Sequence, residues 1–297
     1  MKLLSRLYIW LVKDRWSLGF IEDPLIDIIN GRPYSIKYVK GIPRNKWYAD
    51  PFILDYNDTT IELLVEEWLY KNNKGRIARL VIDRQSFEVL KESIILDLPT
   101  HLSFPFIQRN EGKIFVYPES SASGEWDQYE YNRDLDKLLL VKRIIPQPLT
   151  DSVLTNCFEE DLVFSTVFPT SNKSVLSVFK TDGTIISTIR FNSNTARGAG
   201  DWFFLDGNIY RPAQDCNGGY GRAVIIQEVK NTGKYSFEFR DVCRLVSDNH
   251  KFYRGLHTFN HYKDLSVVDV NGYKREVLGP FTDWLNVLIK RFVLKVR

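Results

Sequence analysis

Two acidic side chains of this sequence stand beside short apolar runs, where a carboxyl group could do acid–base chemistry. Asp50 lies in the run WYADPFIL, and Glu119 lies in KIFVYPES, a segment that is otherwise largely apolar. A carboxylate in such a segment either pairs with a base such as Arg197 or Arg211, or stays protonated on burial and can donate a proton. Asp50 could equally brace a turn before Pro51. Whether the two acids act together depends on the elements that hold them.

Histidines and further polar residues extend this set. His101 and His257 are two of only four histidines, and each stands at the start of an apolar run, where it either contacts a substrate or supports the fold. Asp50 or Asp151 could complete a metal site, but no short ligand spacing such as H-x-x-x-H is present, so we expect no metal and no cofactor. The Gly-rich stretch 215–221 lacks the G-K-[ST] of a phosphate loop and predicts a tight turn. With Asp50 and Glu119 as the catalytic candidates, the predicted substrate-binding residues are Glu66, His101, Ser103, Asp151, Arg197, Arg211, Gln214, Asp215, Tyr220 and His257.

An internal repeat positions these residues. Five segments begin with a polar signature and an apolar strand and continue through a turn into a second strand; their first strands read WYADPFIL, HLSFPFIQ, LTDSVLTN, TARGAGDWFF and RGLHTFNH. The intervals between the signature residues Asp50, Ser103, Asp151, Arg197 and His257 are 53, 48, 46 and 60 residues. Each interval fits one four-stranded blade. We therefore predict an all-β fold, a five-bladed β-propeller with short terminal helices, because two stacked β-sandwiches would not repeat a polar signature.

A propeller would bring these distant residues together. The first strand of every blade lines the central channel, so side chains at equivalent strand starts converge on one mouth. We expect one axial pocket to be surrounded by Asp50, His101, Asp151, Arg197 and His257. The second strands end near the same funnel, which would add Glu66 and Glu119 to it.

Composition limits the partners and the compartment. The 297 residues include 40 Lys and Arg against 37 Asp and Glu, and this small net charge of +3 gives no reason to expect nucleic acid as a partner. The three cysteines are an odd number without C-x-x-C spacing, which favours a reducing compartment. The apolar run at 1–16 is interrupted by Arg6, and we expect neither a signal peptide nor a transmembrane helix. The predicted location is cytoplasmic.

The two ends of the chain share a basic, apolar character. Apolar residues recur at helical spacing in FTDWLNVLIKRFVLKVR, with Lys and Arg on or near the other side, and LLSRLYIWLVKDR is similar. We expect an N-terminal segment with a closing strand at 1–39, the propeller at 40–275 and a basic amphipathic helix at 276–297. These ends either pack on the propeller or attach the protein to an anionic membrane surface, at the inner face of the membrane.

Six motifs taken together carry a resemblance to a known family. In chain order they are W-x-A-D-P-F, H-L-S-F-P-F, Y-P-E-S, R-x-x-G, Y-R-P-A-Q-D followed by Y-G, and G-L-H-T, at 47–52, 101–106, 117–120, 197–200, 210–221 and 255–258. This order resembles the N-terminal propeller domain of plant glucosamine inositolphosphorylceramide transferases and of related single-domain bacterial proteins. The match covers roughly residues 40 to 272.

The resemblance implies a function. The family is similar to five-bladed propeller glycosidases and fructosyltransferases of the arabinanase and levansucrase kind, in which an Asp of a D-P signature in blade one is base or nucleophile. Asp50 matches that residue, whereas the second acid of the arabinanase-like enzymes is replaced at Ser103. We expect glycosyl transfer or hydrolysis on a carbohydrate or nucleotide sugar, in cell-surface polysaccharide or glycolipid biosynthesis, with Glu119 as acid and with Arg197 and Arg211 holding an anionic group. The alternative is a non-catalytic propeller that recognises a carbohydrate or lipid.

Overall fold

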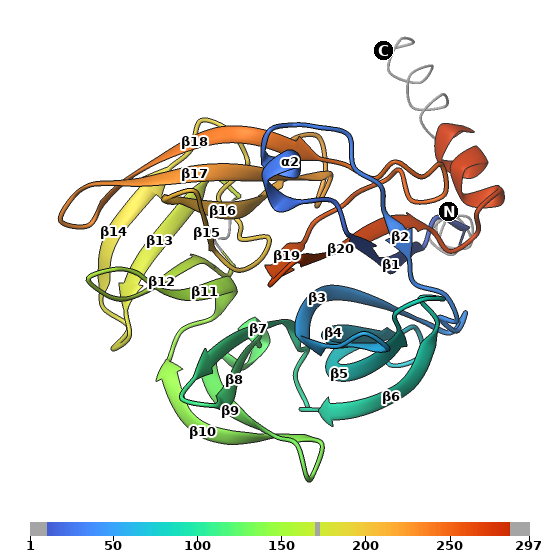
Figure 1. Ribbon diagram of the computed structural model, residues 1–297, viewed down its shortest axis with the longest axis horizontal. Helices are drawn as coiled ribbons and strands as arrows, with labels where there is room; N and C mark the ends of the chain where they lie inside the picture. The colour runs from blue at the N-terminus through green and yellow to red at the C-terminus, as the bar shows by residue number, and fades with distance from the viewer. Residues whose placement is uncertain (1–10, 170–172, 286–297) are drawn as a thin grey trace, which may run out of the picture.

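The computed structural model describes residues 11–169 and 173–285, whose strands form five four-stranded antiparallel sheets around a central axis (Figure 1). Each sheet is one blade, and consecutive blades follow one another around the ring. The predicted five-bladed β-propeller is confirmed, and two stacked sandwiches are excluded.

The first three blades use the chain in simple order. Blade one contains β3 (Lys46–Tyr56), β4 (Thr60–Leu69), β5 (Lys74–Asp83) and β6 (Val89–Leu96). Blade two contains β7 (Ser103–Asn110), β8 (Lys113–Glu119), β9 (Trp126–Asn132) and β10 (Lys137–Ile145), with a short 3₁₀ turn at Ser121–Ser123. Blade three contains β11 (Leu149–Phe158), β12 (Glu160–Val167), β13 (Val175–Lys180) and β14 (Ile185–Arg190).

Blades four and five complete the ring, and blade five joins the two ends of the described chain. Blade four contains β15 (Phe203–Leu205), β16 (Asn208–Asp215), β17 (Ala223–Gly233) and β18 (Ser236–Leu245). Blade five combines β19 (Phe259–Tyr262) and β20 (Leu265–Tyr273) with β1 (Asp14–Ile21) and β2 (Lys37–Tyr38), and the helix α2 (Leu25–Ile29) lies between β1 and β2. β1 pairs with β20 along its whole length, from Asp14 opposite Tyr273 to Ile21 opposite Ser266. This pairing closes the ring.

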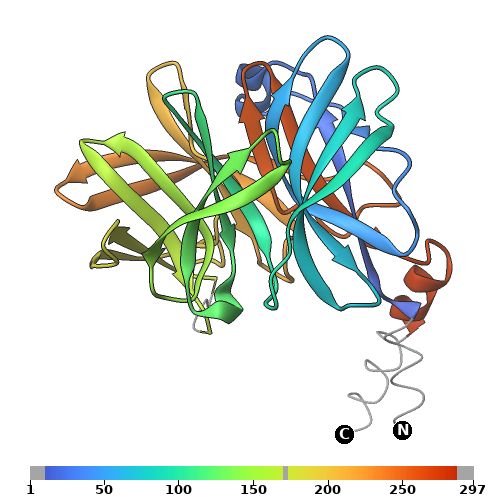
Figure 2. The ribbon, with the colours of Figure 1, turned by 90° about the horizontal axis from the view of Figure 1, so that it is seen from below.

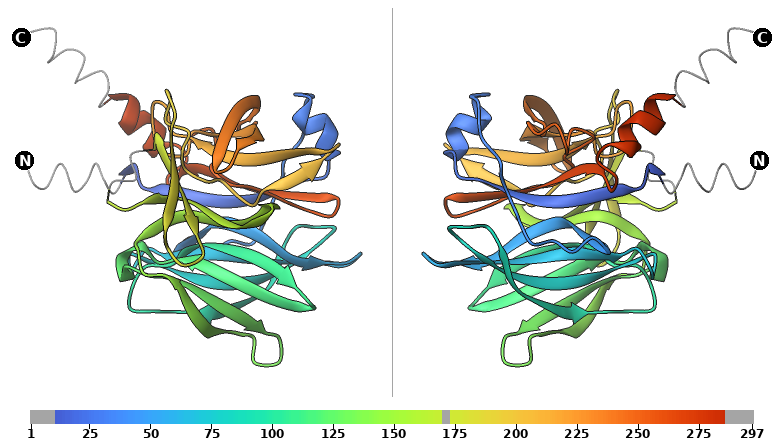
Figure 3. Two further views of the ribbon diagram at one scale, coloured as in Figure 1. Left: turned by 90° about the vertical axis from the view of Figure 1, so that its left-hand side faces the viewer. Right: turned by 90° about the vertical axis from the view of Figure 1, so that its right-hand side faces the viewer.

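Residue patterns explain which strands lie inside. β4 buries both faces of its centre, where Leu63, Leu64 and Val65 are successive, because the faces of neighbouring blades pack against it. β5 alternates instead, with Ala78, Leu80 and Ile82 buried. The views in Figure 2 and Figure 3 show the blades stacked face to face in this way.

A helical stretch at 278–285 follows β20 (Figure 3). The C-terminal helix expected at 276–297 lies outside the described residues beyond position 285, as does the N-terminal segment before position 11. Within the described ranges, no helix combines the length and the apolar character needed to span a bilayer.

Candidate active site

A pocket of about 400 Å³ opens at the end of the axis where the first strands of blades one to three begin. Nine of the twelve predicted site residues line it, from all five blades: Asp50, Glu66, His101, Ser103, Glu119, Asp151, Arg197, Tyr220 and His257. The remaining lining residues are Asp14, Trp16, Trp47, Ala49 and Trp68. Residues separated by about fifty positions in the sequence therefore meet here, as expected for a propeller.

Matching β-bulges fix the carboxylates of the pocket. The register of β3, β7 and β11 shifts at the same point near the start of each strand, and the bulged residues have positive φ angles: 49° at Asp50, 41° at Phe104 and 48° at Asp151. Each backbone N–H is donated to an acid of the preceding blade. Asp50 N lies 3.0 Å from Asp269 Oδ2, Phe104 N lies 3.1 Å from Asp50 Oδ2, and Asp151 N lies 3.0 Å from Glu119 Oε2. The acids thus connect neighbouring blades, and the bulges hold them in place.

A buried imidazole links Asp50 to a second acid. His257 Nε2 lies 3.4 Å from Asp50 Oδ1, and its Nδ1 lies 2.6 Å from Asp269 Oδ2. Burial raises the pKa of Asp50 to about 7, against the lowering effect of the His257 charge. Burial opposes the charged form of His257, yet the neighbouring charges of Asp269 and Asp50 raise its pKa. Trp16 covers the ring at a centroid distance of 4.1 Å, which keeps this cluster away from water.

Glu119 is a candidate proton donor. Burial, and then the charge of Asp151, raise its pKa to about 8, while Arg197 acts in the opposite direction. Its Oε2 accepts the Asp151 N–H. Arg197 Nε donates to Asp151 Oδ2 at 2.5 Å, and its guanidinium lies 5.1 Å from the ring centre of Tyr220. Asp151 and Arg197 therefore neutralise each other, whereas Glu119 keeps its proton near neutral pH.

Glu66 and His101 form a second pair at the rim. His101 Nδ1 accepts the Gly75 N–H at 2.8 Å, so the neutral ring carries its proton on Nε2, 3.7 Å from Glu66 Oε1. Burial, followed by the charge of Lys74, lowers the pKa of His101. Burial, and then the charges of Asp50 and Glu119, raise the pKa of Glu66. A Cβ at Gly75 would lie 2.6 Å from both side chains, so only glycine permits this approach.

Three predicted residues of blade four do not line the pocket. Their polar groups are hydrogen-bonded to other residues of the same blade or of the segment leading into it. Arg211 donates to Gln227 Oε1 at 2.9 Å and to the Ala196 carbonyl, and burial lowers its pKa to about 9. Gln214 Nε2 donates to the Gly198 carbonyl. Asp215 accepts from Asn217 and from Arg244 Nε. Of the two arginines expected to hold an anionic group, Arg197 lines the pocket and gives its Nε–H to Asp151, whereas Arg211 does not line the pocket.

The register corrects the position expected for the second acid. Ser103 pairs with Glu119 just as Ala49 pairs with Glu66, so Ser103 is equivalent to Ala49. The residue equivalent to Asp50 is Phe104, which shares its bulge and its positive φ. The position of blade two that matches Asp50 is therefore Phe104 rather than Ser103.

Several residues that line the pocket or contact its lining were not predicted as site residues. Asp269 is a lone acid in the apolar strand LSVVDVNGY, which is the same signal that singled out Glu119. Trp68 follows Glu66 by two residues and therefore lies on the same face of β4. Its ring stacks on Trp47 at a centroid distance of 5.3 Å. Trp16 comes from β1, and no motif in the sequence pointed to it.

The buried cluster also has the residue types of a metal site. Ligand atoms of Asp50, His257 and Asp269 lie within 4.8 Å of one another. Asp269 already accepts the backbone N–H groups of Asp50, His257 and Thr258, so its oxygens are engaged in hydrogen bonds of the fold. In this arrangement the cluster serves to hold and orient Asp50.

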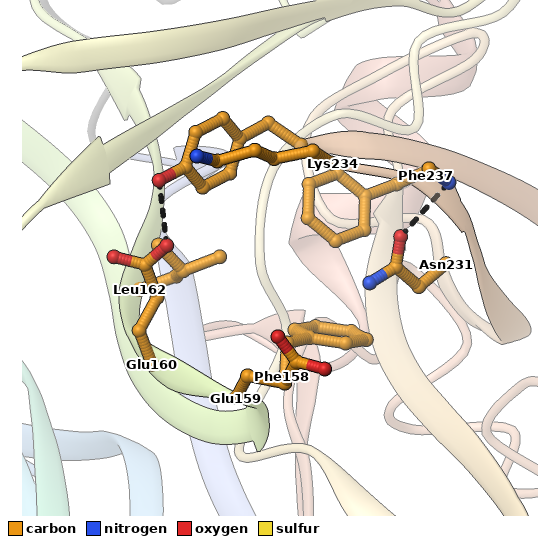
Figure 4. Close-up of a pocket in the computed structure, with 9 residues that line it drawn as sticks. Phe158, Glu159, Glu160, Leu162, Asn231, Lys234 and Phe237 are labelled. Carbon is orange, nitrogen blue, oxygen red and sulfur yellow. Dashed lines mark hydrogen bonds between the residues drawn. The ribbon is translucent and has the colours of Figure 1, made fainter.

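A larger cavity of about 510 Å³ lies elsewhere, between the β11–β12 turn and the β17–β18 turn (Figure 4). Two pairs of its polar groups are hydrogen-bonded: Tyr235 Oη donates to Glu160 Oε1 at 2.6 Å, and Gly233 N donates to Asn231 Oδ1 at 3.1 Å. The axial pocket is smaller, but several acids and bases converge in it. The axial pocket is therefore the candidate site because of the residues that line it, although its volume is smaller.

The raised pKa values predict that the fold loses stability as the pH rises from 6 to 9. Asp50 and Glu119 have reference pKa values of 3.8 and 4.5 and folded values of about 7 and about 8, so the folded state binds their protons more tightly. This contribution is complete below the unfolded pKa values and is lost as the pH passes the folded ones. At about 1.4 kcal/mol per pKa unit, the free energy of unfolding should fall by about 2–4 kcal/mol over this interval.

Thermal unfolding measured across this pH range tests the expectation. Glu119→Gln should flatten the slope, and Glu160→Gln, in the remote cavity, should leave it unchanged. A melting temperature that is equal or higher at pH 9 in the unmodified protein would contradict the predicted protonation.

Comparison with known proteins assigns the family. The domain family described as glucosamine inositolphosphorylceramide transferase 1, N-terminal, matches residues 37–272. Glucosamine inositolphosphorylceramide transferase 1 of Oryza sativa subsp. japonica is 28% identical over 212 residues, and that of Arabidopsis thaliana is 28% identical over 218 residues. These alignments cover 67% and 68% of this chain but only 28% of each plant protein.

Solved structures agree on the architecture. A GH43 beta-xylosidase/alpha-arabinofuranosidase from a compost microbial metagenome has a TM-score of 0.52 at 10% identity, covering 76% of this chain and 84% of that one. A GH43_1 enzyme from Xanthomonas citri has a TM-score of 0.51 at 10% identity, covering 78% and 88%. At this identity the likeness concerns the fold alone. The family match spans most of the chain, and this protein belongs to the glucosamine inositolphosphorylceramide transferase 1 N-terminal domain family.

Proposed function

We propose that this protein binds a carbohydrate in its axial pocket and acts there at a glycosidic bond, by transfer or by hydrolysis. The observation that carries the proposal is the convergence of Asp50 and Glu119, from neighbouring blades, in one pocket walled by tryptophan. Aromatic surface with a few convergent polar groups is the composition expected of a site for a small polar ligand such as a sugar.

The two acids have the properties that glycoside chemistry requires. Glu119, with a pKa of about 8, keeps a proton near neutral pH and can donate it to the leaving oxygen. Asp50, with a pKa of about 7, is partly ionised there and can either attack the anomeric carbon as the leaving oxygen departs or activate the acceptor as a base. His257 holds Asp50 on one side, and the Phe104 N–H holds it on the other. Turnover should accordingly be greatest between about pH 7 and about pH 8.

Family membership supports a role in glycolipid or cell-surface polysaccharide assembly. The plant relatives are named glucosamine inositolphosphorylceramide transferase 1, and this chain spans 28% of their length. The three free cysteines support a cytoplasmic location. A nucleotide sugar is the donor that fits transfer in this compartment.

A non-catalytic recognition module is the second candidate. Asp50 Oδ2 and Glu119 Oε2 both accept backbone N–H groups, so each acid also has a role in joining blades. Phe104 occupies the position of the second acid. Both features would serve a propeller that binds a sugar without cleaving or forming a bond.

A panel of nucleotide sugars and oligosaccharides separates these functions. Calorimetry measures binding, and mass spectrometry of the incubated mixtures measures product. Binding with product supports the enzyme, and binding without product across the panel supports the recognition module. Absence of binding to every member would overturn both readings. Glu160→Gln, altered in the cavity of Figure 4, is the matched control and should behave as the unmodified protein.

A further inference from the structure

Positive charge is concentrated at the two ends of this chain. Residues 1–15 contain four basic residues and one acidic residue, and residues 274–297 contain six basic and two acidic residues. The whole chain carries +3, so residues 16–273 together carry a net charge of −4. The charge of the ends is therefore opposite to that of the propeller body.

The described parts of these ends, residues 11–15 and 274–285, lie together beside the axial pocket. Asp14 lines the pocket, and as the first residue of β1 it lies opposite Tyr273, the last residue of β20. The Lys274 N–H donates to the Lys13 carbonyl at 2.8 Å, which extends the pairing by one step beyond both strands. Lys274 Nζ lies 3.4 Å from the ring centre of Tyr70, and Lys13 Nζ lies 5.5 Å from it. Basic groups from both ends thus meet at the rim.

The helical stretch at 278–285 is fastened to the same place with its apolar side outward. Tyr273 Oη donates to Asp283 Oδ2 at 2.6 Å, and a Cβ at Gly279 would lie 2.6 Å from the Tyr273 ring, so this side of the helix is packed closely. The large apolar residues are instead exposed, at three- and four-residue spacings that place them on one face: Val277 (80%), Leu278 (53%), Phe281 (58%), Trp284 (56%) and Leu285 (41%). We call these five residues the apolar face.

An apolar face beside basic side chains matches the chemistry of an anionic bilayer. Amphipathic helices bind at such a surface by inserting their apolar side chains among the lipids, while basic residues attract the anionic headgroups. A second copy of this chain fits less well, because a symmetric dimer would place the same basic residues opposite each other. Charge complementarity therefore selects a lipid surface as the occupant.

We propose that the apolar face, with Lys13 and Lys274, docks on an anionic membrane and holds the mouth of the axial pocket at the bilayer surface. The pocket then receives its ligand from the plane of the membrane. This inference does not depend on the chemistry of the pocket, and it stands or fails separately from the proposed function.

Sedimentation with liposomes tests the docking. The full chain should sediment with vesicles of phosphatidylcholine and phosphatidylserine, but far less with phosphatidylcholine alone. Binding should decline as salt rises from 0.1 M to 1 M, because the screening length falls from about 10 Å to about 3 Å. Phe281→Ser/Trp284→Ser should weaken binding by at least about tenfold, since two large apolar side chains would no longer insert.

A matched variant controls for loss of apolar surface. Leu140→Ser/Phe204→Ser removes residues that are 62% and 61% exposed on other blades, and it should bind vesicles as the unmodified protein does. Bound vesicles should slow hydrogen exchange at 70–74 and 274–285 and leave β10 unaffected. Equal sedimentation with and without anionic lipid would overturn the proposal, as would dimerisation in solution that Phe281→Ser/Trp284→Ser abolishes. Protection of β10 in place of the rim would overturn the orientation of the pocket.

Discussion

Replacing Asp50 with Asn, or Glu119 with Gln, should reduce turnover of the carbohydrate substrate by about 10²–10⁴, the usual contribution of a positioned acid or base. Each amide occupies nearly the same volume as the acid and keeps one carbonyl oxygen. In Asp50→Asn that oxygen could still accept the Phe104 N–H, and in Glu119→Gln it could still accept the Asp151 N–H. The blades should therefore stay joined and sugar binding should persist, while proton transfer or attack is lost.

Turnover and binding must be measured on the same preparations. Calorimetric affinity for the sugar that binds best should change little in either variant, and circular dichroism should be unchanged. Glu160→Gln, an acid-to-amide change outside the pocket, should keep full turnover. Undiminished turnover in Asp50→Asn or Glu119→Gln would remove that residue from the mechanism.

Asp269→Ala should lower the free energy of unfolding by about 3–5 kcal/mol, the typical cost of leaving a buried charge without its partner. Asp269 is fully buried and accepts the N–H groups of Asp50, His257 and Thr258. It is also the nearer of the two acids that contact His257. Its removal would leave three buried donors unsatisfied and would loosen the joint between blades five and one.

Urea denaturation measures this loss. Asp58→Ala, in the exposed turn between β3 and β4, should change stability by no more than about 0.5 kcal/mol. Asp269→Asn, which keeps one acceptor oxygen, should lose less than Asp269→Ala. A loss below about 1 kcal/mol in Asp269→Ala would show that these hydrogen bonds do not join the blades as described, since each unsatisfied buried donor alone costs about 1–3 kcal/mol.

Strand architecture could be predicted from the sequence because its determinants are local. Alternating apolar residues, turn residues and a polar signature recur at intervals of 46 to 60 positions, and a repeat of that length with short strands has few solutions other than a propeller. Once the repeat is known to form a propeller, residues at equivalent strand starts must converge on its central axis. This is why Asp50, His101, Asp151 and His257 could be assigned to one pocket without coordinates.

The hydrogen-bond partners of individual side chains could not be predicted, because a side chain in a strand of known direction still has several possible partners within reach. Arg211 was expected to face a ligand, but it donates to Gln227 and to a carbonyl within its own blade. Arg197 was expected to hold an anion, and it does line the pocket, but its Nε–H is given to Asp151, a partner that the sequence did not indicate. Both outcomes depend on side-chain distances across and between blades, which no spacing in the sequence encodes.

The sequence by itself determined the five-bladed fold and most of the residues that meet on its axis, since periodicity 2 within strands and the repeat between blades are properties of the chain. Only the tertiary structure decided how those residues are held. A one-residue bulge assigns Phe104, not Ser103, to the place of an acid, and it directs the N–H groups of Asp50, Phe104 and Asp151 to carboxylates of neighbouring blades. The contact of Asp50 with Asp269 forms only when the ring closes, because only closure places the last blade against the first.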